Sequence, residues 1–113
     1  MKARKTNPDI VLTEAKVLSA VAQGTTEGSI REVANATLRK YQWRDPAHQT
    51  IFKALLAIPS ERPETVQSEL PTRLTRMGFP DLAWEDVFAQ PRLSRAEAER
   101  LIEQLSRSTP ASL

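Results

Sequence analysis

The sequence predicts an all-α protein, a compact orthogonal bundle of five or six short helices. Several segments carry apolar residues at the three- and four-residue spacing of a helix, and no segment keeps the apolar–polar alternation of a strand. Asn-Gly and Asp-Gly pairs, which are typical of tight hairpins, do not occur. The 113 residues are enough for one domain with a modest core.

The first two helices are placed by their end signals. The first is expected to start after Thr13, a good N-cap, although Asn7-Pro8 offers an earlier start. The second is expected to begin with a capping box formed by Ser29 and Glu32 and to run to about Lys40.

Proline residues place the next two helices. Asp45 is the expected N-cap of the third helix, with Pro46 at its first position. A fourth helical region from about Pro63 keeps apolar residues at regular spacing until Gly78. Pro71 lies inside this region and is expected to kink or split the helix.

Two further helices complete the expected fold. A short one covers about residues 82–88, and a last one starts at Ser94, which forms a second capping box with Glu97. The expected single helical domain therefore covers residues 13–106. A basic, flexible arm (1–12) precedes it and a frayed tail (107–113) follows it.

Composition excludes several classes of function. The chain has no cysteine, one histidine and three glycines, so thiolate metal sites, multi-histidine metal sites and glycine-rich dinucleotide loops are excluded. No phosphate-binding loop of the ATPase type occurs, and we expect no cofactor. The formal charge of +2 gives only a weak overall field. No signal peptide or membrane-spanning stretch is evident, which predicts a cytoplasmic protein.

His48 is the one side chain that titrates near neutral pH at its ordinary pKa. It could act as a general base. The favoured interpretation is structural, a histidine at a helix start that bonds a neighbouring carbonyl or hydroxyl, because no nucleophile motif accompanies it. We therefore expect a protein that is not an enzyme.

Basic side chains offer a candidate nucleic-acid surface. Tyr41 and Trp43 lie among the basic residues, and aromatic rings beside cations can stack on bases. The favoured alternative places both rings in the core, with the cations as their wet rim. The candidate nucleic-acid contacts are Arg39, Lys40, Arg44, Arg73 and Arg76.

Apolar side chains in the second half of the chain offer a candidate protein-docking surface. Phe79, Trp84 and Phe88 form either an exposed groove for a partner or a second core cluster, and the core is the favoured alternative. If the last two helices dock a partner, the candidate anchors are Trp84, Phe88, Leu101 and Leu105.

The stretch from Trp43 to Leu55, with Ala47-His48 followed by Ile51-Phe52, resembles the N-terminal domain of replicative DNA helicases of the DnaB type. Upstream and downstream blocks agree in order and approximate spacing, and together the three cover about residues 13–79. The upstream block is Glu14 with Val17-Leu18 and Ala20-Val21, and the downstream block is Thr65-Val66 with Glu69-Leu70. The residues that carry the motif are Glu14, Trp43, Pro46, His48, Ile51 and Phe52.

The resemblance implies an all-α head domain that has no catalysis of its own, supports ring assembly and docks the primase. It also implies a structural role for His48. Two departures limit it, since the ATPase motor is absent and no clear counterpart of the family's dimerising helical hairpin follows Phe88.

The sequence therefore favours a non-catalytic protein–protein interaction module without an ATPase motor. The expected partner is a protein of the replication machinery, a helicase or a primase, with a second copy of the chain as a further candidate. The alternative is a small helical DNA-binding protein that uses the five cations named above. An enzyme based on His48 is the least favoured of the three. No membrane partner is expected.

Overall fold

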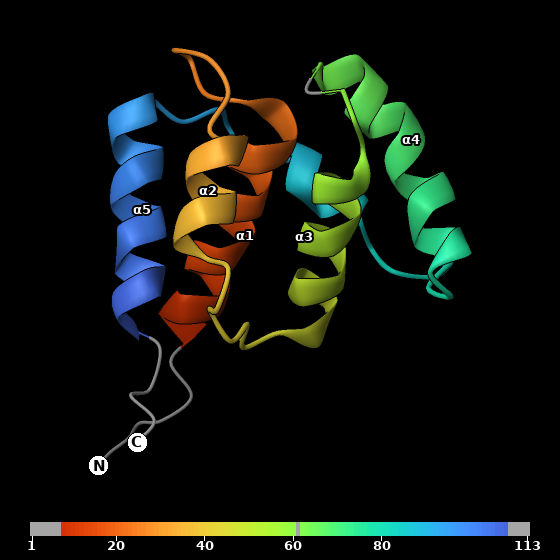
Figure 1. Ribbon diagram of the computed structural model, residues 1–113, viewed down its shortest axis with the longest axis horizontal. Coiled ribbons are helices and arrows are strands. Elements are labelled where there is room, and N and C mark those ends of the chain that lie inside the picture. The colour runs from red at the N-terminus through yellow and green to blue at the C-terminus, as the bar shows by residue number, and fades with distance from the viewer. Residues whose placement is uncertain (1–7, 61, 109–113) are drawn as a thin grey trace.

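The computed structural model describes residues 8–60 and 62–108. Within these residues the chain forms five α-helices and one short 3-10 helix, with no strand, so the all-α fold class is confirmed. Figure 1 shows α1, α2, α3 and α5 standing side by side, with α4 packed against the outer side of α3. The elements are α1 (Pro8–Gln23), α2 (Arg31–Thr37), α3 (Pro46–Ala57), α4 (Pro63–Arg76), η1 (Glu85–Phe88) and α5 (Arg95–Ser108).

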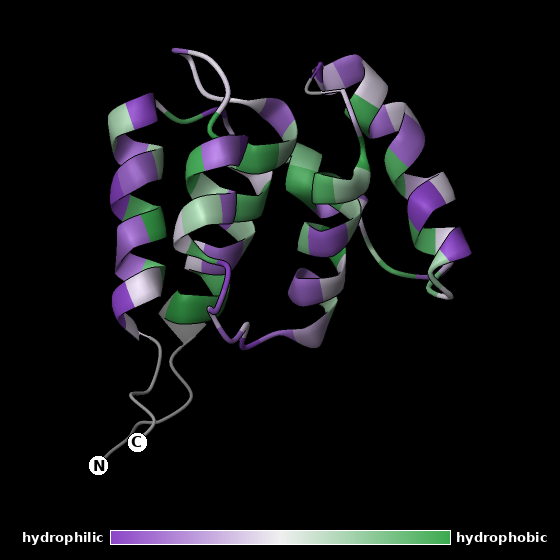
Figure 2. Ribbon diagram, viewed as in Figure 1, coloured by the Kyte–Doolittle hydropathy of each residue, from purple (hydrophilic) through white to green (hydrophobic). Residues whose placement is uncertain are grey.

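Helix α1 lies at the centre of the bundle. It contacts α2, α3, α4, η1 and α5. Its sequence is mostly apolar, and Val17, Leu18 and Ala22 are fully buried. A helix that is apolar on most of its surface has to be covered by neighbours, which is why the other elements surround it. In Figure 2 the helices around it carry both hydrophilic and hydrophobic residues along their length.

The start of α1 corrects the expected domain boundary. The helix begins at Pro8, the earlier of the two starts that the sequence offers, so residues 8–12 are helical and not part of a flexible arm. Residues 1–7 lie outside the described part of the chain. Proline at the first helical position lacks only an amide that would have had no partner there, which explains this start.

Helix α2 is shorter than expected at both ends. Ile30, not Ser29, is its N-cap, although the Ser29 Oγ still accepts a hydrogen bond from the Arg31 amide at 3.2 Å. The helix ends at Thr37, short of Lys40. Beyond this end the chain stays close to the bundle, because Leu38 and Tyr41 are both buried in the core.

Arg31 joins α2 to the end of α3. Its guanidinium donates to the carbonyl oxygen of Ile58 at 2.5 Å and to that of Ser60 at 2.9 Å. Ile58 is the C-cap of α3, so a buried cation lies at the electronegative end of that helix. The sequence alone did not indicate this contact.

The start signals of α3 are confirmed. Asp45 is its N-cap, and the Asp45 Oδ1 accepts from the Ala47 amide at 2.9 Å, with Pro46 in the first turn. Ile51 and Leu55 on the inner face are buried. The capping bond fixes where the helix begins, and thereby which of its faces meets α1.

Helix α4 runs through Pro71 as one element and is not split, contrary to one of the two expected outcomes. Proline at this position removes the hydrogen bond to the carbonyl of Gln67, a residue that is exposed, so water can satisfy that carbonyl. Val66, Leu70 and Leu74 stay buried on the inner face. Their burial holds the helix together across the proline.

The last third of the chain differs from the prediction in two details. Residues 85–88 form a 3-10 helix, not a short α-helix. Helix α5 continues to Ser108, so residues 107–108 belong to the helix, and the rest of the expected frayed tail (109–113) lies outside the described residues. The start of α5 agrees with the prediction, because the Glu97 amide donates to the Ser94 Oγ at 3.1 Å.

Candidate functional site

The carboxylate of Glu14 is the centre of a polar cluster that joins α1 to α3 and to the loop before it. The residue is fully buried on α1. Its Oε2 accepts from the Tyr41 hydroxyl at 2.5 Å and from the Arg44 amide at 2.6 Å. Its Oε1 lies 2.9 Å from the His48 Nδ1 and accepts from the Asp45 amide at 3.3 Å. One side chain of α1 therefore holds both the loop before α3 and the first turn of α3.

The hydrogen bonds decide the charge of this carboxylate. Burial raises the pKa of Glu14, but bonds from His48, Tyr41 and the amides of Arg44 and Asp45 lower it by more, so its pKa is below the ordinary value of 4.5. The pKa of Tyr41, which donates to this carboxylate, is raised by burial and by the bond to Glu14. The cluster therefore contains an ionised carboxylate whose lone pairs are taken by donors on the chain itself.

His48 has a different partner from the one expected. Its imidazole bonds the Glu14 carboxylate from another helix, not a neighbouring carbonyl or hydroxyl. Its Nε2 lies 3.7 Å from the Asp45 Oδ2, and the side chain is 14% exposed. Among the described residues, no hydrogen bond joins His48 to a hydroxyl group. This geometry orients the ring and ties α3 to α1.

Trp43 is the central ring of an aromatic row beside this cluster. Its centroid lies 5.1 Å from that of Tyr41, edge to face, and 5.0 Å from that of Phe52, at a tilt of 43°. Tyr41 and Phe52 are buried, whereas Trp43 is only partly buried. The prediction that Tyr41 belongs to the core is therefore confirmed, and Trp43 lies at its edge, along a groove of about 300 Å³ between the end of α2 and α3.

The five cations proposed for nucleic-acid contacts do not form one surface. Arg39, Lys40 and Arg44 lie on the loop between α2 and α3, whereas Arg73 and Arg76 lie at the far end of α4, on the opposite side of α3 in Figure 1. The Arg44 guanidinium donates to the carbonyl of Ser108 at 2.8 Å. The Arg73 guanidinium lies 4.0 Å from the carboxylate of Glu69.

The proposed docking anchors on α5 are wrong. Leu101 and Leu105 are 7% and 0% exposed and belong to the core, where α5 packs against α1 and α2. Trp84 and Phe88 are partly buried, with ring centroids 6.0 Å apart in an edge-to-face contact. They pack against the core and keep part of their surface in contact with solvent.

Phe79 is an exposed aromatic side chain, contrary to the favoured expectation that it joins a core cluster with Trp84 and Phe88. It is 47% exposed, and Met77 beside it is 39% exposed. A Schellman motif ends α4 here, with the Phe79 amide bonding the Leu74 carbonyl at 2.8 Å and the Gly78 amide bonding that of Thr75 at 3.0 Å. Gly78 has φ +94°. A glycine followed directly by an apolar residue at a helix end was the available signal for this arrangement.

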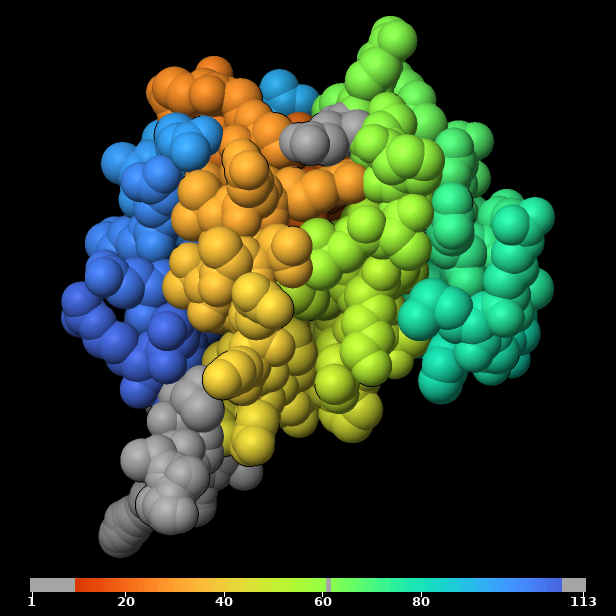
Figure 3. All heavy atoms as spheres, in the orientation of Figure 1, coloured from red at the N-terminus to blue at the C-terminus, as the bar shows by residue number. Residues whose placement is uncertain are grey.

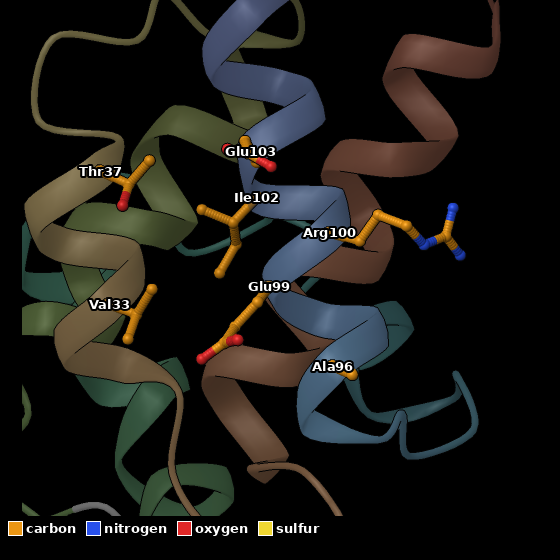
Figure 4. Close-up of a pocket in the computed structure, with 7 residues that line it drawn as sticks. All are labelled: Val33, Thr37, Ala96, Glu99, Arg100, Ile102 and Glu103. Atoms are coloured by element: carbon orange, nitrogen blue, oxygen red, sulfur yellow. The ribbon is translucent and has the colours of Figure 1, made fainter.

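A second groove, of about 460 Å³, separates α2 from α5. Figure 4 shows Val33 of α2 and Ile102 of α5 lying toward each other across it, while Arg100 points away from it. The carboxylates at its edge already have partners on their own helix. Glu99 pairs with Arg95 at 3.0 Å and Glu103 pairs with Arg107 at 3.3 Å, so the groove offers no unpaired charge to a ligand.

Comparisons with protein-family models, with curated proteins and with solved structures give no match. Within residues 8–60 and 62–108, no three metal-ligating side chains gather where they could hold an ion. No helix in this part of the chain is both long enough and apolar enough to cross a membrane.

Proposed function

We propose that this chain is a non-catalytic protein–protein interaction domain, similar to the N-terminal domain of DnaB-type replicative helicases and without an ATPase motor. Its proposed partner is a protein of the replication machinery, a helicase or a primase, which places the domain in the cytoplasm. The observation that carries the proposal is the exposed aromatic side chain of Phe79, which the end of α4 holds in a fixed position.

The geometry of Phe79 suits a docking anchor. Binding energy at protein interfaces is concentrated in a few side chains, with aromatic residues prominent among them. The two Schellman bonds fix the backbone of Phe79 before any partner arrives, so less conformational entropy is lost on docking. Met77, two residues before Phe79, is also exposed, and Trp84 with Phe88 follows on the same stretch of chain. This surface (Met77 and Phe79) replaces the one on α5 as the proposed docking site.

The residues that carry the helicase resemblance support the proposal in a second way. Glu14 and His48 bond each other across α1 and α3, and Trp43 packs on Phe52 in the same region. Residues distant in sequence thus share one structural task, to fix the loop before α3 against α1. A motif built from such contacts fits a domain whose family resemblance lies in its scaffold and not in catalysis.

The proposal is tested by isothermal titration of the protein with the purified replicative helicase and, separately, the primase of its own cell. We expect one of them to bind, and Phe79→Ser to weaken that binding by about 2 kcal/mol, or roughly thirtyfold, as expected for a hot-spot aromatic. Leu12→Ser is the matched control, because Leu12 is an apolar side chain of α1 with 48% exposure. Equal affinities of Phe79→Ser and the parent would remove Phe79 from the site, and absence of binding by both proteins would overturn the proposed partner.

DNA binding by Arg39, Lys40, Arg44, Arg73 and Arg76 makes a different prediction. Binding that rests on phosphate neutralisation releases counterions and weakens steeply with salt. Fluorescence anisotropy of labelled single- and double-stranded DNA, at low and at physiological salt, separates the two functions. Binding that persists at physiological salt would favour the DNA-binding function over protein docking.

A further inference from the structure

The groove between the end of α2 and α3 has an apolar wall and a basic rim. Trp43, Phe52 and Leu56 contribute the wall. Arg39 from the loop after α2 and Lys53 from α3 line the same groove and are exposed. In Figure 3 the yellow atoms around residues 38–45 meet the yellow-green atoms of α3 on the face turned to the viewer.

The charge at this groove is of one sign. Two cations line it and no carboxylate does, among the residues that the structure describes. Neither Arg39 nor Lys53 takes part in an ion pair within that part of the chain. Asn35 and Gln49 add amide groups to the lining, which can donate to and accept from a peptide backbone. The other large groove, between α2 and α5, has carboxylates that are already paired, so the two grooves differ in what they offer.

The aromatic contacts favour a peptide over a nucleic acid. Base stacking needs an open ring face. Trp43 contacts Tyr41 on one side and Phe52 on another, with both centroid distances close to 5 Å, and it is partly buried. Two cations in a groove of about 300 Å³ suit one or two side chains better than a track of phosphates.

We propose that this groove binds an acidic segment of a partner protein. One apolar side chain of the segment packs on the wall formed by Trp43 and Leu56, and its carboxylates face Arg39 and Lys53. The site is separate from the docking surface at Met77 and Phe79, which lies beyond α3 at the end of α4 in Figure 1. Peptide binding in the groove does not depend on docking at Met77 and Phe79.

The test uses the fluorescence emission of Trp43, which lines the groove, to measure peptide binding. In the full chain with Trp84→Phe, Trp43 is the one tryptophan left. The probes are capped pentapeptides that carry four Asp or Glu residues around one Leu, Ile, Met or Phe, and matched peptides with Asn and Gln in place of the acids. We expect the acidic peptides to shift the Trp43 emission saturably and the amide peptides to bind much more weakly. Saturation by both kinds alike would overturn the charge argument.

Two charge-reversal variants locate the site. Arg39→Glu with Lys53→Glu is expected to weaken binding of the acidic peptide by roughly tenfold or more, since two ion pairs become repulsive contacts. Arg92→Glu with Arg100→Glu changes the net charge equally at exposed positions outside the groove and is expected to leave the affinity within about twofold. Far-UV circular dichroism is the check that both variants fold.

Three outcomes would overturn the proposal. One is the absence of saturation by any acidic peptide up to millimolar concentration. Another is equal weakening by the two double variants. The third is tighter binding of oligothymidylate than of every peptide at physiological salt, which would assign the groove to single-stranded nucleic acid. Phe79→Ser is expected to leave peptide binding unchanged, so failure here and failure of the proposed docking function are separate results.

Discussion

Replacing Glu14 with glutamine keeps the shape of the side chain but removes its charge and turns one acceptor oxygen into a donor group. The native carboxylate accepts from the Tyr41 hydroxyl and the Arg44 amide on one oxygen, and from the Asp45 amide on the other, which also meets His48. In either orientation, the new amide group of glutamine faces a backbone N–H that cannot turn away.

The magnitude follows from the less costly of the two orientations. With its NH₂ toward His48, the glutamine meets an imidazole that can accept in its other tautomer, and only the bond from the Asp45 amide, at 3.3 Å, is lost. An unsatisfied buried donor costs about 1–3 kcal/mol, and the remaining bonds lose their charge assistance, whereas an uncharged side chain is cheaper to bury. We expect a loss of about 2 kcal/mol for Glu14→Gln, and about 4 kcal/mol for Glu14→Ala, which leaves all the donors without this acceptor.

Urea unfolding at pH 7, followed by circular dichroism, measures both losses. Glu103→Gln is the control, since Glu103 is exposed on α5 and the same change of residue there is expected to have no measurable effect. A Glu14→Gln protein as stable as the parent, or more stable, would refute the reasoning. It would mean that the cost of burying the charged carboxylate equals or exceeds what its hydrogen bonds contribute.

Three other predictions follow from the same structure. Because the pKa of Glu14 is lowered by folding, its contribution is fully present above about pH 4.5 and is lost as pH falls through the folded value, so the stability gap between the parent and Glu14→Gln is expected to shrink in urea titrations below pH 4.5. Leu105→Ala is expected to cost about 3 kcal/mol, as a fully buried leucine does, whereas Phe79→Ser should change the urea midpoint little, and the opposite order would contradict the assignment of core and surface. Gly78→Ala, at φ +94°, is expected to cost about 1 kcal/mol in thermal unfolding, and an unchanged melting temperature would show that the turn holding Phe79 tolerates a side chain.

The ends of the helices show how far local sequence can predict structure. The caps at Asp45 and Ser94 are formed by residues two or three positions from their partners, so chain-local chemistry decides them. The end of α2 does not follow from such chemistry. The chain leaves the helix at Leu38, and Leu38 and Tyr41 are both buried in the common core, so contacts with other helices act on this segment besides its own helical tendency.

The candidate sites also combine features that local sequence predicts with features that only tertiary packing decides. Leu105 and Phe79 are both large apolar residues in the second half of the chain, and their types do not distinguish a core position from an exposed one. The packing of α5 on α1 buries Leu105, whereas the turn after α4 leaves Phe79 exposed. His48 was identified as a residue that could act chemically or structurally, but its partner on α1 lies 34 positions away.

The sequence by itself determined the helical class, most helix starts and the absence of cysteine chemistry, because these depend on residue types and short-range spacing. Only the tertiary structure decided that the Glu14 carboxylate binds the loop before α3, that Leu101 and Leu105 are core residues, and that an apolar groove has a basic rim. Each of these depends on which helix faces meet. The contacts between helix faces are decided by packing of the core as a whole, since burial of apolar surface involves segments far apart in sequence.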